Sequence, residues 1–182
     1  MFIQTEPTPN PLTMKFIPGV PVMPAGTAFF TDAKQALDAP LALALFAIEG
    51  VQAVFLAQDF VTITKDDATH WEALKPIVLT SMMDHFVAGK PVVLQTKNEA
   101  SSSSEDSELV KQIKELIETR VRPAVAQDGG DIIFRGFEDG IVQLELHGAC
   151  SGCPSSTITL KNGIETMLKH YVPEVVAVEA VN

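Results

Sequence analysis

Residues 147–156 read HGACSGCPSS and mark the point where a strand pattern ends and a helix pattern begins. Cys150 and Cys153 within this stretch are the only two cysteines of the 182-residue chain. Small residues surround them, which leaves the backbone free to bend around a bulky group. Two cysteines are too few for a disulfide framework, so we expect their sulfurs to serve metal binding or redox chemistry.

The residues before the cysteines predict a β-hairpin. Segments 131–137 (DIIFRGF) and 141–147 (IVQLELH) are separated by Glu-Asp-Gly, which is a turn signal. Apolar and polar residues alternate in the second segment, as in a strand with one buried face. Further upstream one apolar stripe indicates a helix that we expect Pro123 to end. The stripe consists of Leu109, Ile113, Leu116, Ile117 and Val121.

The residues after the cysteines predict a helix and a last strand. Pro154 followed by two serines is a typical helix start. The buried stripe of this helix is expected to be Leu160, Ile164, Met167, Leu168 and Tyr171. Segment 174–180 (EVVAVEA) then reads as a strand. The second half of the chain therefore has the predicted order αββαβ.

A polar connector divides the chain. Residues 97–107 (KNEASSSSEDS) combine a serine run with acidic residues, which is the composition of a flexible linker. We therefore predict an N-terminal domain over residues 1–96 and a C-terminal domain over residues 108–182.

The N-terminal half mixes helix and strand signals. Its many prolines exclude a helix before about residue 27 and favour a meander of strands. Helices are expected over residues 41–48 and 69–88, with a hairpin of segments 51–57 and 60–65 between them. The predicted fold class is α+β, with two small α/β-sandwich-like domains.

The position of the cysteines gives them a chemical meaning. A Cys-x-x-Cys loop that opens onto a helix N-terminus faces unpaired backbone N–H groups, which favour thiolate over thiol. Two thiolates are half of the ligand set of a tetrahedral zinc ion or an iron–sulfur cluster. Two-fold pairing of the chain is the simplest way to supply the other half. Because the apolar stripes include neither sulfur, we expect replacement of either cysteine by serine to leave the fold intact.

Histidines are the other candidate ligands. His147 lies three residues before Cys150, but its strand phase places it on the polar face. We interpret it as a solvated strand histidine rather than a third ligand. The remaining histidines stand alone in helical segments and are expected at the surface or core edge: His70, His85 and His170.

Two segments around the cysteines resemble a known family. RPAVAQDGGDIIF (122–134) and GACSGCPSSTITLKNGIETML (148–168) are similar to the NifU-type C-terminal domain of the Nfu iron–sulfur cluster carriers. Residues 1–95, with TEPTPNPLTMKFIPG near their start, resemble the N-terminal domain that accompanies it. Within this likeness the Asp-Gly-Gly-Asp segment, residues 128–131, is interpreted as a tight turn that binds nothing.

The resemblance implies a carrier or scaffold rather than an enzyme. Cys150 and Cys153 of two chains would hold a [4Fe-4S] cluster between them, with [2Fe-2S] as a further possibility, for delivery to apo-proteins. The implied partners are a second copy of the chain, apo iron–sulfur enzymes and upstream assembly scaffold proteins.

Two alternatives stay open at this point. A thioredoxin-like dithiol oxidoreductase also uses a Cys-x-x-Cys pair, but near the start of a βαβ domain rather than between the last hairpin and the last helix. A zinc-bridged structural dimer would use the same four sulfurs.

Charge, hydropathy and the N-terminal sequence indicate which classes of partner and which locations to expect. The net charge is −10 and the basic residues are scattered, so nucleic acid is not expected as a partner. The longest apolar run, residues 41–48, is too short to span a membrane. The N-terminus shows neither an export signal nor an Arg-rich presequence, from which we predict a bacterial cytoplasmic location, or the mitochondrial matrix for a processed form.

Overall fold

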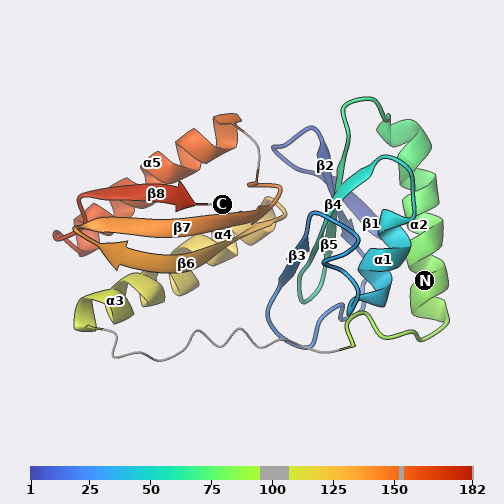
Figure 1. Cartoon of the computed structure of the whole chain (residues 1–182), viewed down its shortest axis with the longest axis horizontal. Coiled ribbons are helices and arrows are strands. Elements are labelled where there is room, and N and C mark those ends of the chain that lie inside the picture. Colours follow the sequence, from blue (N-terminus) through green and yellow to red (C-terminus); the bar gives the residue numbers. More distant parts are fainter. Residues whose placement is uncertain (95–106, 152–153, 182) are drawn as a thin grey trace. The chain divides into compact units, whose positions relative to one another are not determined.

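The computed structural model describes residues 1–94, 107–151 and 154–181 (Figure 1). The chain divides into two compact units, Met1–Asn98 and Glu99–Asn182. The predicted linker, residues 97–107, lies outside the described residues except for Ser107. This residue caps the first helix of the second unit, because its hydroxyl accepts a hydrogen bond from the Val110 N–H at 3.4 Å. The predicted α+β class is confirmed.

The first unit is built on an antiparallel sheet with the order β1-β2-β5-β4-β3 (Figure 1). Its strands are β1 (Gln4–Pro7), β2 (Thr13–Ile17), β3 (Ala28–Phe30), β4 (Val51–Leu56) and β5 (Val61–Lys65). The predicted β4–β5 hairpin is confirmed. The strands expected before residue 27 are present, because β1 and β2 pair as antiparallel neighbours, whereas the next strand, β3, pairs with β4 at the far edge rather than with β2. A proline- and glycine-rich segment, residues 18–27, connects β2 to β3. Within this segment the Val22 N–H donates a hydrogen bond to the Gln58 carbonyl at 2.7 Å.

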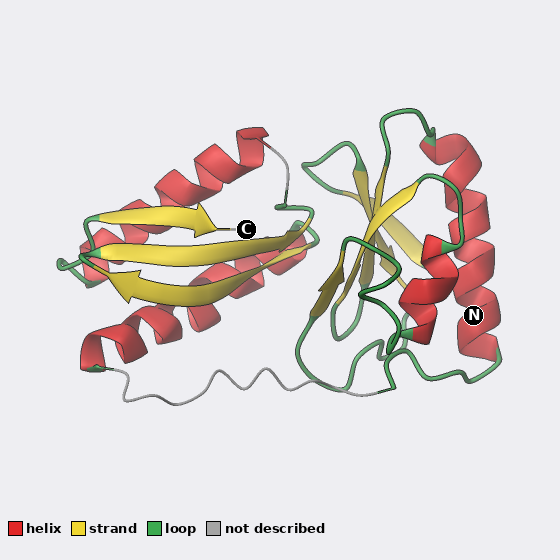
Figure 2. Ribbon diagram, viewed as in Figure 1, coloured by secondary structure: helices red, strands yellow, loops and turns green. Residues whose placement is uncertain are grey.

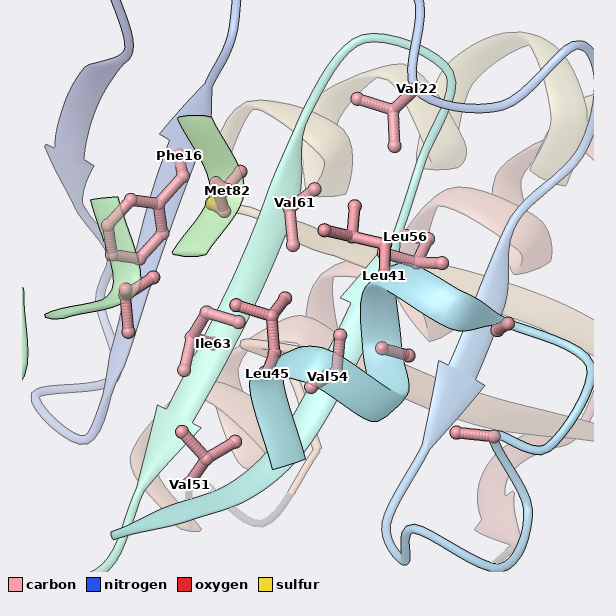
Figure 3. Packing of buried hydrophobic residues seen from close by; sticks show 14 of the residues in the cluster. Phe16, Val22, Leu41, Leu45, Val51, Val54, Leu56, Val61, Ile63 and Met82 are labelled. Atoms are coloured by element: carbon pink, nitrogen blue, oxygen red, sulfur yellow. The ribbon is translucent and has the colours of Figure 1, made fainter. Parts of the chain in front are cut away.

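Two helices cover one face of this sheet, α1 (Pro40–Phe46) and α2 (Trp71–Val87). Pro40 stands at the first position of α1, where its missing N–H costs no helical hydrogen bond. Figure 3 shows Leu45 from α1 close to Ile63 from β5, within the same buried cluster as Met82 from α2. All three side chains are fully buried, and each such burial contributes roughly 1.5–3 kcal/mol.

The second unit has a three-stranded sheet with the order β6-β7-β8. The strands are β6 (Gly130–Glu138), β7 (Ile141–Gly148) and β8 (Ala177–Val181). β6 and β7 form the predicted antiparallel hairpin, and β8 pairs with β7 in parallel. Figure 2 shows the helices on one side of this sheet, where α5 (Pro154–Tyr171) contributes Ile164 and Leu168 to the core. The predicted order αββαβ is confirmed.

The helix before β6 is longer than predicted. It runs through α3 (Glu108–Leu116), a π-helical turn η1 (Ile117–Val121) and α4 (Arg122–Gln127). The expected end at Pro123 is wrong, because the π-helical turn resets the hydrogen bonding before the proline. The Arg122 N–H bonds the Ile117 carbonyl five residues back, and Pro123 then occupies the first turn of α4, where no donor is needed.

In the described ranges 1–94, 107–151 and 154–181, no helix combines the length and the apolar character that a bilayer crossing requires.

Candidate functional site

Cys150 lies in the turn between β7 and α5, as the sequence predicts. The turn is closed by a hydrogen bond from the Ser151 N–H to the Gly148 carbonyl at 3.1 Å. The Ala149 N–H also bonds the Gly129 carbonyl at 3.2 Å, which ties the turn to the start of β6. Cys153, the second predicted ligand, lies outside the described residues. The helix α5 begins one residue later, at Pro154.

The side chain of Cys150 is buried. It is 5% exposed and belongs to the apolar core cluster of the second unit. The expectation that the core includes neither sulfur is therefore wrong for Cys150. The turn folds back over the end of the β6–β7 hairpin, a tertiary arrangement that the apolar periodicity of helices and strands does not report. Serine at this position would place a hydroxyl in an apolar setting, so its effect on folding is not neutral.

Gly130 provides the space that the thiol occupies. A Cβ atom built at Gly130 would lie 2.5 Å from Cys150 Sγ and 2.9 Å from the His147 carbonyl oxygen. The register pairs Gly130 with Gly148, so glycines face each other on the two strands beside the cysteine turn. Such close approach is possible only because neither strand carries a side chain at this level.

An ion pair between buried Asp131 and partly buried Arg122 fixes the start of β6. Both carboxylate oxygens of Asp131, 4% exposed, accept hydrogen bonds from Arg122, each at 2.8 Å. Arg122 also pairs with Glu118 on the exposed side. The hydrogen bond to Asp131 is the main reason why the pKa of the Arg122 guanidinium is raised above its ordinary value. The ion pair between Arg122 and Asp131 joins α4 to the strand that carries Gly130.

The interpretation of residues 128–131 as a simple turn is incomplete. Gly129 has a φ of +78°, which suits the turn and favours glycine. The two residues after it have other roles, because Gly130 makes room for the thiol and Asp131 takes part in the ion pair. Sequence reasoning missed Arg122 and Asp131 as a pair. Their opposite charges nine positions apart, on either side of two glycines, are the signal that could have suggested it.

His147 is buried rather than solvated. It is 8% exposed, and its Nε2 lies 2.7 Å from Glu145 Oε1. Burial acts to raise the pKa of Glu145, but hydrogen bonds from His147 and Arg135 outweigh it, and the pKa is lowered. The predicted strand phase is right, since the register places His147 opposite Asp131 on a charged face. The expectation of solvation is wrong, because the carboxylate takes the place of water.

The other histidines occupy separate places. His85 is buried in the first unit, and its Nε2 lies 3.1 Å from the Pro91 carbonyl oxygen. His70 is the residue before α2, and the His170 ring packs edge-on against Tyr171. In residues 1–94, 107–151 and 154–181, no three His, Cys, Asp or Glu side chains gather as a metal site.

The residues present fit an iron–sulfur cargo in their donor chemistry. The sulfur of Cys150 is the type of ligand that iron–sulfur clusters require. Its turn is made of small residues, which admit a bulky inorganic group. The described part of one chain supplies no further ligand cluster beside this sulfur.

Comparisons with known proteins identify the family of the chain. Residues 113–179 match the NifU-like domain, and residues 3–89 match the family described as scaffold protein Nfu/NifU N terminal. The chain is 53% identical over 183 residues to the human NFU1 iron-sulfur cluster scaffold homolog, mitochondrial. The alignment covers 100% of this chain and 72% of the human protein. The chain belongs to the Nfu family.

Two further proteins are similar to this chain. NifU-like protein 4, mitochondrial, of Arabidopsis thaliana is 52% identical over 185 residues, with 98% of this chain and 65% of that protein covered. The solution structure of a NifU-like protein from Saccharomyces cerevisiae aligns at a TM-score of 0.47 with 26% identity, over 54% of this chain and 87% of that one.

The relatives correct one expectation. We predicted a bacterial cytoplasmic location from the N-terminal sequence, with the mitochondrial matrix as the alternative for a processed form. The human protein and the two Arabidopsis proteins are all named as mitochondrial, which contradicts the prediction of a bacterial cytoplasmic location.

Proposed function

We propose that this Nfu protein is a scaffold and carrier of iron–sulfur clusters, with Cys150 and Cys153 as its ligands. The observation that carries the proposal is a cysteine sulfur in a turn of small residues directly before α5, in a chain whose relatives are named cluster scaffolds. The cluster is cargo, which the protein binds and passes on, so no bond of a substrate is made or broken by a catalytic group.

The ligand count favours a pair of chains. A [4Fe-4S] cluster takes four thiolates, whereas each chain has two cysteines. The described residues hold no His, Cys, Asp and Glu cluster that could complete the shell within one chain. A two-fold pair that brings two cysteine turns together supplies four sulfurs with one kind of surface. A [2Fe-2S] cluster would use the same four ligands.

The burial of Cys150 affects how the cluster would be loaded and released. A thiol that is 5% exposed is not available to a cluster shared with a second chain, so loading requires the turn to move outward. When the cluster binds, the sulfur leaves the apolar cluster and binds iron, and when the cluster is released, the sulfur returns to its buried position. This return favours delivery to an apo-protein over permanent retention.

The division of the chain suggests how the parts cooperate. In the proposal residues 108–182 form the cluster-binding domain, residues 97–107 the linker and residues 1–96 a domain that contacts other proteins. Upstream assembly scaffolds would supply the cluster, and apo iron–sulfur enzymes would receive it. The chain spans 72% and 65% of the human and Arabidopsis relatives, so these partners are proposed for this chain rather than transferred.

Anaerobic reconstitution with iron and sulfide tests the function. We expect a brown protein with broad visible absorbance and about two irons per chain, as a four-iron cluster shared by two chains gives. Native mass spectrometry is expected to show two chains with one cluster. Cys150→Ala and Cys153→Ser abolish the colour, whereas Ser151→Ala, which keeps both sulfurs, retains it.

Other outcomes would point elsewhere. A colourless product that contains zinc would favour the zinc-bridged dimer. A fully loaded species of one chain, with no small thiol bound, would contradict the proposed pairing.

A further inference from the structure

The Cys150 thiol has a defined place in the second unit. The sulfur lies over Gly130, within the apolar cluster that contains Leu146 and Ile164. The spacing is tight, because one methyl group at position 130 would come within 2.5 Å of Sγ. Real carbon and sulfur atoms do not approach so closely, so the absence of a side chain here is a condition for the observed position of the thiol.

The floor beneath the thiol is rigid. Gly130 is held by its pairing with Gly148 and by the neighbouring ion pair between Asp131 and Arg122. The Ile132 N–H also donates to Asp131 Oδ1 at 2.8 Å, which fixes the carboxylate against its own strand. A side chain added at position 130 would therefore meet two neighbours, the Cys150 sulfur at 2.5 Å and the His147 carbonyl oxygen of β7 at 2.9 Å, and it displaces the cysteine in so far as the two paired strands hold.

We propose that Gly130 is a positioning residue for the Cys150 thiol. The buried space over Gly130 that the sulfur occupies, called the seat below, competes with the cluster for the sulfur. The inference rests on the proposed function for its second half. A sulfur in the seat does not bind iron at a shared site, and a sulfur bound to iron has left the seat. Whatever destabilises the seated state therefore strengthens cluster binding by the same factor.

The same strand offers a matched control. Gly136 lies six positions further along β6, and a Cβ there would meet only Gln143 Oε1 at 3.4 Å. This distance is an ordinary contact with the end of a mobile side chain. Gly130→Ala and Gly136→Ala thus make the same chemical change in one strand, and only the first fills the seat.

Thiol alkylation in the cluster-free chain tests the seat itself. In a Cys153→Ser background Cys150 is the only thiol, so intact mass reports its reaction with iodoacetamide. A buried thiol reacts through local opening, and overpacking the seat with Gly130→Ala is expected to raise the rate about tenfold. Gly136→Ala should leave the rate unchanged. Equal rates in all three proteins would overturn the seat.

A double-mutant cycle separates the seat from a general loss of stability. Gly130→Ala is expected to destabilise the chain less when Cys150→Ala has already removed the sulfur, because part of the clash is gone. Additive effects of the two substitutions would contradict a contact between them. If Gly130→Ala fails to fold, Asp131→Asn loosens the same floor without adding atoms, and a smaller rise in alkylation is expected. An unchanged rate in that variant would also count against the seat.

Cluster retention tests the competition. After reconstitution of the full chain, Gly130→Ala is expected to hold its cluster against a chelator with about tenfold higher apparent affinity than wild type or Gly136→Ala. Equal or weaker retention would overturn the competition. Failure of wild type to take up iron would instead reject the proposed function, and the alkylation and cycle experiments, which use cluster-free protein, would still decide the seat.

Discussion

The two units bury polar groups of different kinds. The buried polar residues of the first unit are Asn10, Thr13, Thr62 and His85, whereas those of the second unit are Asp131 and His147. Asn10, Thr13 and His85 of the first set bond to neutral groups, whereas the second set pairs with Arg122 and Glu145. In the second unit the buried polar residues Asp131 and His147 are thus each paired with a partner that carries charge.

The neutral set of the first unit closes turns and joins strands. Asn10 Oδ1 accepts from the Leu12 N–H at 3.1 Å, and the hydroxyls of Thr13 and Thr64 lie 3.0 Å apart on paired strands. Such bonds each contribute about 1 kcal/mol and add no charge to the interior. Stability in this unit therefore rests mainly on its apolar core.

The charged set of the second unit has a different purpose. A buried ion pair rarely adds net stability over apolar packing of similar size, although loss of one partner is costly. The Asp131–Arg122 pair instead fixes the position of the start of β6. Asp131 and Arg122 hold the strand that forms the floor under Cys150, so the comparison teaches that charge here serves placement rather than stability.

The largest expected effect comes from breaking the ion pair. Asp131→Ala removes two hydrogen bonds from Arg122 and one from the Ile132 N–H to a buried carboxylate, and we expect the second unit to lose about 4 kcal/mol of unfolding free energy. Amide hydrogen exchange in β6 and β7 should report the loss. The fluorescence of Trp71, the only tryptophan, should show an unchanged first unit. Glu118→Ala removes the exposed partner of Arg122 and is expected to cost about 0.5 kcal/mol; equal losses would refute the comparison.

A smaller effect is expected from the apolar core of the first unit. Leu45→Ala removes a fully buried side chain and should cost about 3 kcal/mol, measured by urea unfolding with Trp71 fluorescence. Amide exchange in β6 and β7 should not change. The control Leu37→Ala alters an exposed leucine and should shift stability by less than about 0.5 kcal/mol. Faster exchange in β6 after Leu45→Ala would show that the units are not independent.

The smallest effect concerns pH. Burial lowers the pKa of His85, so the folded first unit resists the proton that the unfolded chain accepts. The unfolding free energy should therefore be constant above the ordinary histidine pKa of about 6.5 and fall as the pH drops below it. Urea unfolding followed by Trp71 fluorescence measures this slope. His85→Gln should flatten it, and an unchanged slope in that variant would assign the effect to other groups.

Local patterns predicted most elements of the second unit. The alternation in residues 141–147 and the proline at position 154 placed β7, the cysteine turn and α5 correctly, because these signals depend on neighbours in sequence. The end of the preceding helix was missed, since a π-helical turn accommodates Pro123 in a way that no local propensity reports. The position of β3 was missed as well, because it depends on a crossing over the sheet.

The environment of the site was harder to predict than its location. Burial of Cys150 depends on Gly130, twenty positions earlier, and on the register that brings the two together. Burial of His147 depends on its partner Glu145 and on the same end of the hairpin. Sequence patterns identify donor atoms, whereas tertiary contacts decide where those atoms rest.

The π-helical turn also explains the apolar spacing of the helix that precedes the site. Ile113, Ile117, Val121 and Val125 are all buried although they recur strictly every fourth residue. In a regular α-helix that repeat drifts by about 40° per step, so the last residue would turn away from the sheet by roughly 120°. The wider turn of η1 takes up part of this angle. Removal of one residue from η1 would therefore rotate α3 about its axis and expose Ile113, so the length of this segment is constrained even where its side chains face solvent.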